Sequence, residues 1–401
     1  MAREAIVARA RRGGFRTAIL VAGIVLVAAN LRPAITVVGP IVEQIRLDTG
    51  LAAATAGLLT TLPVLAFGFG AWVAAMLARR FGIEKALFAS VVVLAAGIGV
   101  RAIAGTTPLF VGTLVLGTGI AVANVLLPAL VKRDFPGHLG VMTALYSGLL
   151  GGMGAVGSGV AVPLADGTAL GWRGALAIWA LPALVAAVVW IPQLTGKGTR
   201  GEVADPVAAP GDTWRSRLGW EVTLFFGVQA FGFYVTIAWL PTILIEDGLG
   251  EGRAGLMLFV LQVGALISML TFPQAADRAT DQRRLVLLMS SLSLVGITGL
   301  IVAGSTAVGV WVVLLGLAQG AGLALALMFF VLRTHDSHQA SELSGMAQGV
   351  GYTIAATGPV LAGLMHDATG GWTIVLVLLL VMAAIQLVMG LRAGRAAVIG
   401  G

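Results

Sequence analysis

Arg32 and Pro33 interrupt an apolar stretch, "VLVAANLRPAITVVGPI" at residues 25–41, that is long enough to cross a membrane. A guanidinium stays charged in a protein and costs about 3 kcal/mol at the centre of a bilayer, so it needs a compensating partner. Pro33 removes a helix hydrogen bond, and the freed backbone groups are tolerated only where they face a cavity. Asn30 adds a neutral donor and acceptor. These residues indicate a positively charged cavity, which favours a small anion as its ligand.

The partner of Arg32 is not evident in the sequence. None of the 18 acidic residues falls in the middle third of an apolar stretch, so no carboxylate shares the depth of Arg32. Three alternatives are open for its partner: carbonyl groups freed by Pro33, a polar cavity wall, and the substrate. We prefer the substrate, because ionisable residues within membranes usually mark transport pathways.

Further polar side chains within apolar stretches are candidates for the same binding site. Membrane tyrosines usually lie at the water interface, but the three tyrosines of this chain lie well inside apolar stretches. A hydrogen bond to a neighbouring helix explains any single one equally well. The candidates are Tyr146, Tyr234, Tyr352, Asn124, Gln262 and Gln348. Glu43 and His366, near the ends of apolar stretches, are candidates for carrying a proton.

Apolar stretches of this length recur along the whole chain. Its 401 residues are 58% hydrophobic and only 11% charged, whereas a soluble domain has about 25% charged residues. We therefore predict an all-α polytopic membrane protein with twelve transmembrane helices, each able to cross about 30 Å of hydrocarbon. They lie at 17–42, 51–78, 86–104, 108–131, 139–165, 173–193, 218–245, 254–276, 285–304, 307–332, 342–365 and 372–391.

The positive charges predict the orientation in the membrane. With the N-terminus placed in the cytoplasm, 20 of the 25 Lys and Arg residues lie on the cytoplasmic side, four on the other side, and Arg32 within the membrane. This asymmetry follows the positive-inside rule, so both termini are predicted to be cytoplasmic in a multi-pass cytoplasmic (inner) membrane protein. The net charge of +7 therefore reflects orientation and not a nucleic-acid partner.

The chain divides into two similar halves. The longest polar interruption, 194–217, is rich in Gly, Pro and charge and is predicted to be a cytoplasmic linker. It separates an N-terminal six-helix bundle at 1–193 from a C-terminal six-helix bundle at 218–401. "GW" opens both the sixth and the twelfth predicted helix. Two repeats around a site at the membrane midplane are typical of secondary transporters.

Other chemistry is not supported by the residue patterns. Gly152, Gly154 and Gly157 in "GGMGAVG" match a nucleotide-binding spacing, but they lie in a predicted membrane helix, where close helix packing explains them better. His335 and His338 are an incomplete metal-ligand set. The chain has no cysteine and no catalytic constellation, so we expect no enzyme activity, no metal and no cofactor.

Two loops and four longer stretches resemble known transporters. "MLARRFGIEK", which contains Arg79, Arg80 and Gly82, is similar to the loop motif that follows the second helix in the major facilitator superfamily. Arg79 stands where that motif usually has aspartate, whereas "QAADRATDQRR" in the second half keeps Asp277 and Arg278. Four longer stretches resemble, more specifically, the cyanate/2-nitroimidazole transporter family of that superfamily. These stretches are "NLRPAITVVGP", "GLLTTLPVLAFG", "NVLLPALVKRDFP" and "GMAQGVGYTIAATGPVLAGLMHDATGGW".

The resemblance implies the major facilitator fold, alternating access, and transport of small anions or small polar solutes. Together with the residues, it predicts a secondary active transporter for a small, cyanate-like organic or inorganic anion, coupled to protons. The alternative is a broad-specificity efflux transporter for neutral or aromatic compounds. The expected partners are the substrate, protons and the lipid bilayer, and a monomer suffices.

Overall fold

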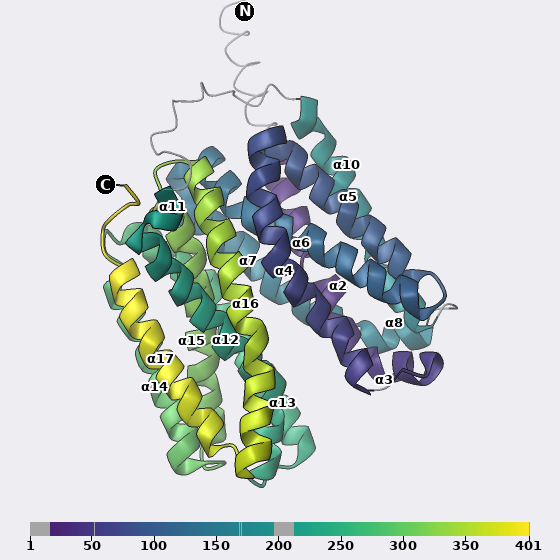
Figure 1. The fold of residues 1–401 in the computed structure, drawn as a ribbon, viewed down its shortest axis with the longest axis vertical. Coiled ribbons are helices and arrows are strands. Elements are labelled where there is room, and N and C mark those ends of the chain that lie inside the picture. Colours follow the sequence, from purple (N-terminus) through teal and green to yellow (C-terminus); the bar gives the residue numbers. More distant parts are fainter. Residues whose placement is uncertain (1–16, 52, 168, 170, 196–211, 401) are drawn as a thin grey trace, which may run out of the picture.

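The computed structural model describes residues 17–51, 53–167, 169, 171–195 and 212–400, and its regular structure in these ranges is entirely helical (Figure 1). The first half comprises helical residues 17–30, followed by α2 (Pro33–Thr36), α3 (Val38–Thr49), α4 (Ala53–Phe81), α5 (Ile83–Ala102), α6 (Thr106–Asp134), the 3₁₀ turn η1 (Pro136–His138), α7 (Leu139–Gly159), α8 (Ala161–Gly167), α9 (Trp172–Ala177) and α10 (Ala180–Thr195). The second half comprises α11 (Asp212–Arg215), α12 (Arg217–Glu246), α13 (Glu251–Arg278), α14 (Arg283–Ala303), α15 (Val308–Leu332), α16 (Ser337–Thr369) and α17 (Thr373–Ala393).

The twelve predicted membrane segments agree with these helices. Ten helical segments of the described chain are long and apolar enough to cross a membrane, and a bent pair within α4 makes an eleventh. The predicted segment 342–365 lies in α16, which has 33 residues but a more polar composition. Its first half buries Gln339, Ser341 and Glu342 against protein, which explains why this helix is less apolar than the others.

Glycines allow several of the sharp reversals between helices. Gly82 joins α4 to α5 with φ +87°, and Gly370 ends α16 with φ +68°. These left-handed conformations are unfavourable for residues that carry a Cβ atom. The turn between α4 and α5 therefore requires glycine at position 82, in the "RRFG" loop.

The helices form two bundles, one from each half of the chain (Figure 1). In the first bundle, α6 packs against α4 and α5, and α10 packs against α5. In the second, α15 packs against α13 and α14, and α17 packs against α12 and α14. The predicted linker at 194–217 lies mostly outside the described residues, which resume with α11.

The two bundles contact each other from the middle of the molecule to the end that carries α11. We call this end the linker end. Arg79 of α4 pairs with Glu342 of α16 at 3.2 Å. The Lys132 ammonium donates to the main-chain carbonyls of Val331 and Thr334 at the end of α15. In Figure 1 the two groups of helices converge at this end and diverge toward the end that carries α3.

Close approach of α7 and α13 adds to this contact. The Gly140 amide donates to a carboxylate oxygen of Asp277 at 3.0 Å. A Cβ atom at Gly140 would lie 2.7 Å from the Pro273 carbonyl oxygen, so only glycine fits without displacing the backbone of α13. The linker end is therefore closed by backbone packing as well as by charged side chains.

Candidate functional site

The first membrane segment breaks at Arg32. Arg32 occupies the N-cap of the short helix α2, and Pro33 begins that helix. Proline suits this position because its missing N–H would have no helical partner there. The Thr36 hydroxyl donates to the Gly154 carbonyl of α7 at 2.8 Å, which ties the broken segment to its neighbour. The sequence thus places a helix break, and α7 holds it.

The glycines of "GGMGAVG" make room for this break. A Cβ atom at Gly154 would lie 3.4 Å from the Cβ of Arg32, and one at Gly157 would lie 2.7 Å from the Cα of Pro33. The motif therefore allows α7 to pack directly against the interrupted helix, as the sequence pattern predicts for closely packed membrane helices.

The Arg32 side chain reaches across to the other bundle. It is half-buried, and it lies beside the hydroxyl groups of Tyr234 in α12 and Tyr352 in α16, close enough to interact with them electrostatically. Within the described residues no carboxylate forms an ion pair with it. Arg32 is therefore a membrane-embedded cation whose polar neighbours are neutral hydroxyls from the opposite bundle.

Aromatic rings surround this contact. The Tyr352 ring centroid lies 5.1 Å from that of Phe67 in α4, 5.2 Å from Phe226 in α12 and 6.5 Å from Tyr234. These are ordinary distances for interacting aromatic pairs. We call Arg32, Tyr234, Tyr352, Phe67 and Phe226 the Arg32 site. Because both bundles contribute to it, its geometry depends on how the bundles are arranged.

The Asn30 and Gln348 side chains have hydrogen-bond partners of their own, and Asn124 takes part through its main-chain carbonyl. The Asn30 amide donates to the carbonyls of Leu26 and Pro182, at 2.7 and 3.1 Å, and so joins the first segment to α10. The Gln348 amide donates to the Asn124 carbonyl at 3.2 Å and to the Ser344 hydroxyl at 2.8 Å. Asn30 thus braces the break within one bundle, whereas Gln348 links the two bundles.

Tyr146 and Gln262 are placed differently from the other candidates. Tyr146 is buried in α7, eight residues before Gly154 and therefore about 12 Å from it along the helix axis. Gln262 is exposed on α13. The Tyr146 hydroxyl is buried without a hydrogen-bond partner in the described part of the chain.

Of the two proton-carrier candidates, only His366 has a described side chain; the Glu43 side chain lies outside the described part. The Nε2 atom of His366 is 3.2 Å from a Glu246 carboxylate oxygen, and its ring stacks on Trp372 with centroids 4.2 Å apart. Asp367 also lies within 3.5 Å of the ring. His366 thus joins α16 to α12 at the end of the second bundle away from the linker.

The residues of the loop motifs lie at the linker end. Arg79 and Asp277 make the bundle-to-bundle contacts described above, whereas the Arg80 guanidinium lies over the Phe81 ring at 5.3 Å. Arg278 is exposed in the last turn of α13. The first-half loop therefore uses Arg79, at the unusual position, to pair with an acid on the other bundle.

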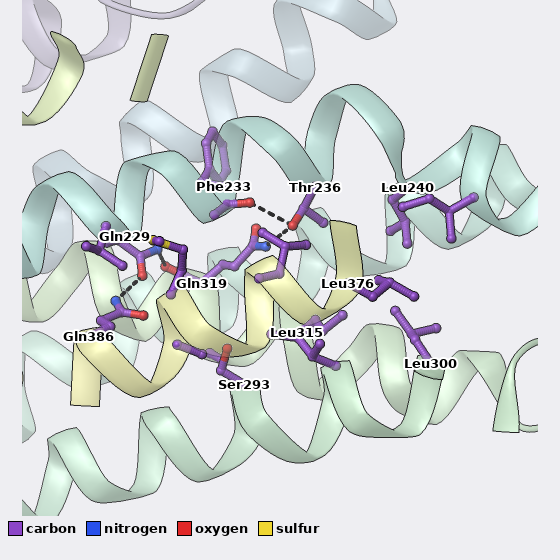
Figure 2. A pocket seen from close by; sticks show the side chains of 18 residues that line it. Gln229, Phe233, Thr236, Leu240, Ser293, Leu300, Leu315, Gln319, Leu376 and Gln386 are labelled. Carbon is purple, nitrogen blue, oxygen red and sulfur yellow. Dashed lines mark hydrogen bonds between the residues drawn. The ribbon is translucent and has the colours of Figure 1, made fainter. Parts of the chain in front are cut away.

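Figure 2 shows a separate cavity of about 40 Å³ inside the second bundle, whose mostly apolar lining includes three glutamines. Gln386 donates to Gln229 at 2.5 Å, Gln229 donates to the Gln319 carbonyl at 2.8 Å, and the Gln319 amide donates to Thr236 at 2.9 Å. A Cβ atom at Gly322 would lie 2.1 Å from the Gln229 oxygen, so glycine leaves room for this network. The network braces α12, which carries Tyr234.

Sequence reasoning did not single out Phe67, Phe226 or the three cavity glutamines. Phenylalanine in an apolar helix carries no signal of its own, because packing against lipid or protein explains it equally well. Gln229, Gln319 and Gln386 do carry the signal of polar groups in apolar stretches that identified Gln262 and Gln348. In the described residues no three His, Cys, Asp or Glu side chains form a group that would hold a metal ion.

Comparison with known proteins agrees with this architecture. Residues 24–356 match the model of the Major Facilitator Superfamily. The chain is 41% identical over 377 residues to the 2-nitroimidazole transporter of Escherichia coli (strain K12), covering 94% of this chain and 95% of that protein. It is 29% identical over 350 residues to the cyanate transport protein CynX of the same organism, covering 87% and 90%.

A solved structure of the proton:xylose symporter XylE, bound to 6-bromo-6-deoxy-D-glucose, matches the fold with a TM-score of 0.76 at 13% identity, over 95% of this chain and 97% of that one. The relatives are transporters and not enzymes. The chain therefore belongs to the Major Facilitator Superfamily, as a multi-pass membrane transporter of the cyanate/2-nitroimidazole transporter family.

Proposed function

We propose that this protein is a secondary active transporter that binds a small anion at the Arg32 site and carries it across the cytoplasmic membrane by alternating access. The observation that carries the proposal is the Arg32 guanidinium, which lies beside two tyrosine hydroxyls of the opposite bundle and pairs with no described carboxylate. A membrane-embedded cation without a counter-ion is costly. A bound anion compensates that cost.

The composition of the site suits small, planar solutes. A guanidinium presents parallel N–H groups that match carboxylates and other oxyanions. Phe67, Phe226 and the two tyrosine rings supply flat apolar surfaces beside it. The names of two relatives, a cyanate transport protein and a 2-nitroimidazole transporter, fit a site for small solutes of this kind.

The position of the site between the bundles suits alternating access. Tyr234 and Tyr352 approach Arg32 from the second bundle, and an anion that binds between them contacts both bundles at once. Rocking that separates α4 from α16 and α7 from α13 would open the linker end, which is closed in this conformation. We assign the linker end to the cytoplasm from the distribution of Lys and Arg, and we expect a functional monomer.

Proton coupling completes the proposal. An inside-negative potential opposes entry of an anion by about 2.3 kcal/mol per charge per 100 mV, so concentrative uptake needs a cotransported cation or an exchanged anion. His366, beside Glu246 and Asp367, is the described candidate for carrying the proton. Glu43 remains a second candidate.

Export of neutral aromatic compounds is the alternative function. The observation that favours it is the group of four aromatic rings at the Arg32 site. In that case Arg32 serves to hold the two tyrosines, and its charge does not contribute to recognition.

A thermal-shift screen of the purified protein separates the two functions. The ligands are cyanate and 4-hydroxybenzoate as anions, and 1-methyl-2-nitroimidazole, which has no ionisable N–H, and benzamide as neutral compounds. A ligand at 100 times its dissociation constant stabilises the folded state by about 2.7 kcal/mol. We expect stabilisation by at least one anion and weaker effects from the neutral compounds. Stabilisation by neutral aromatics alone would favour the export function.

Replacement of His366 by glutamine tests the proton route. We expect His366→Gln to lose accumulation of cyanate driven by an imposed pH gradient, because the glutamine amide carries no exchangeable charge. Exchange of labelled for unlabelled cyanate across the same proteoliposomes should persist. Gradient-driven accumulation equal to that of the wild-type protein would exclude His366 as the carrier.

A further inference from the structure

Arg101 is a second buried arginine; it lies at the end of its membrane span, beside the break in the first segment. It is in the last turn of α5, with only 1% of its surface exposed. Its Nη1 atom donates to the Ala34 carbonyl at 2.7 Å, and Ala34 follows Arg32 by two residues. The Nε and Nη2 atoms are buried and have no hydrogen-bond partner in the described structure.

Close packing of α5 and α6 holds Arg101 in this place. A Cβ atom at Gly112 of α6 would lie 2.4 Å from the Arg101 backbone nitrogen, and one at Gly97 would lie 2.4 Å from the Leu116 nitrogen. Glycine at both positions lets the helix backbones touch, as in other membrane helix pairs. The position of Arg101 against Ala34 therefore depends on the small residue at 112.

The charge of Arg101 is uncompensated as well as buried. No ion pair to its guanidinium occurs in the part of the chain that the structure describes. A buried cation without a counter-ion is costly and is usually retained for function. Ala34 lies two residues after Arg32, and Cα atoms at that spacing are within about 7 Å of each other. Arg101 therefore contacts the same short backbone segment that carries Arg32.

We propose that Arg101 is a positioning residue that supplies a second positive charge to the anion site, acting from behind the first segment through its bond to the Ala34 carbonyl. The proposal rests on the proposed function of the Arg32 site. Arg101 itself does not touch the ligand. It holds the broken turn in place and raises the positive potential at the Arg32 site, which strengthens binding of anions and not of neutral compounds.

Three substitutions of Arg101 test this role through the dissociation constants of cyanate and of 1-methyl-2-nitroimidazole, a neutral compound without an ionisable N–H. Arg101→Gln keeps an N–H donor on a shorter side chain but removes the charge, Arg101→Met removes both, and Arg101→Lys keeps the charge. We expect the Gln and Met variants to lose about tenfold in cyanate affinity, equivalent to about 1.4 kcal/mol, and Lys to restore most of it. Affinity for 1-methyl-2-nitroimidazole should not change.

Two outcomes overturn the proposal: unchanged cyanate affinity in Arg101→Gln, or a parallel loss of both ligands in all three variants. If the Gln and Met proteins do not fold, Gly112→Ala carries the test by displacing the Arg101 backbone. Gly99→Ala in α5 is its control, because a Cβ atom there meets no atom within 4 Å. Loss of cyanate binding in Arg32→Gln but not in Arg101→Gln would leave the proposed function intact and remove this inference alone.

Discussion

Arg32→Gln is expected to lower anion affinity by about 100-fold, equivalent to about 2.7 kcal/mol, because hydrogen bonds to charged groups contribute about 1.5–3 kcal/mol each. Glutamine keeps a polar amide, on a shorter side chain, but removes the positive charge that compensates the ligand. The measurement is the dissociation constant of cyanate, from anion-dependent thermal shift or calorimetry in detergent. Size-exclusion elution in the absence of ligand establishes that the variant is folded.

Arg32→Lys and the conservative tyrosine variants make this test specific. Lysine keeps the charge but lacks the planar fork of N–H groups with which a guanidinium can contact two hydroxyls and an anion together. We therefore expect Arg32→Lys to recover only part of the cyanate affinity. Tyr234→Phe and Tyr352→Phe each remove one hydroxyl beside Arg32 and should have smaller effects than Arg32→Gln. Unchanged cyanate affinity in Arg32→Gln, with neutral aromatics still bound, would make Arg32 structural and support the export function.

A disulfide between α4 and α16 is expected to abolish transport by holding the linker end closed. A Cβ atom built at Gly345 lies 3.8 Å from the Cβ of Ala75, which is the mean separation in disulfides, about 3.8 Å. The chain has no cysteine, so Ala75→Cys with Gly345→Cys introduces the only thiols. We expect oxidation to stop anion flux in proteoliposomes almost completely, and reduction to restore it.

Each single cysteine variant is the control for the double variant, since it carries one substitution and cannot form the bond. A Cβ atom at Gly345 lies 3.1 Å from the Ala71 carbonyl oxygen, so the single Gly345→Cys variant also measures the cost of crowding there. Full cross-linking with normal flux would mean that α4 and α16 stay together during transport. In that case the bundles do not alternate at this contact.

The helical architecture and the position of the charged break could be predicted from the sequence alone. A bilayer excludes unsatisfied backbone groups, so apolar stretches of sufficient length become helices whatever their neighbours are. Pro33 ends a helix locally because it lacks an N–H, and α2 begins at this residue. The prediction of twelve helices in two bundles is confirmed. It could be made for the same reason, since it depends on composition along the chain.

Which side chains meet at the break was decided only by the tertiary structure. Tyr234 and Tyr352 come from the other bundle, and Phe67 and Phe226 join them although nothing in their local sequence sets them apart. Asn30, two residues from Arg32, instead donates to the Pro182 carbonyl, and Arg101, 69 positions later, reaches Ala34. Every span is apolar on nearly all sides, so the pattern along the chain does not reveal which face of a helix meets another helix. Close packing at glycines such as Gly112, Gly154 and Gly157 sets those faces, because backbones approach only where no Cβ atom intervenes.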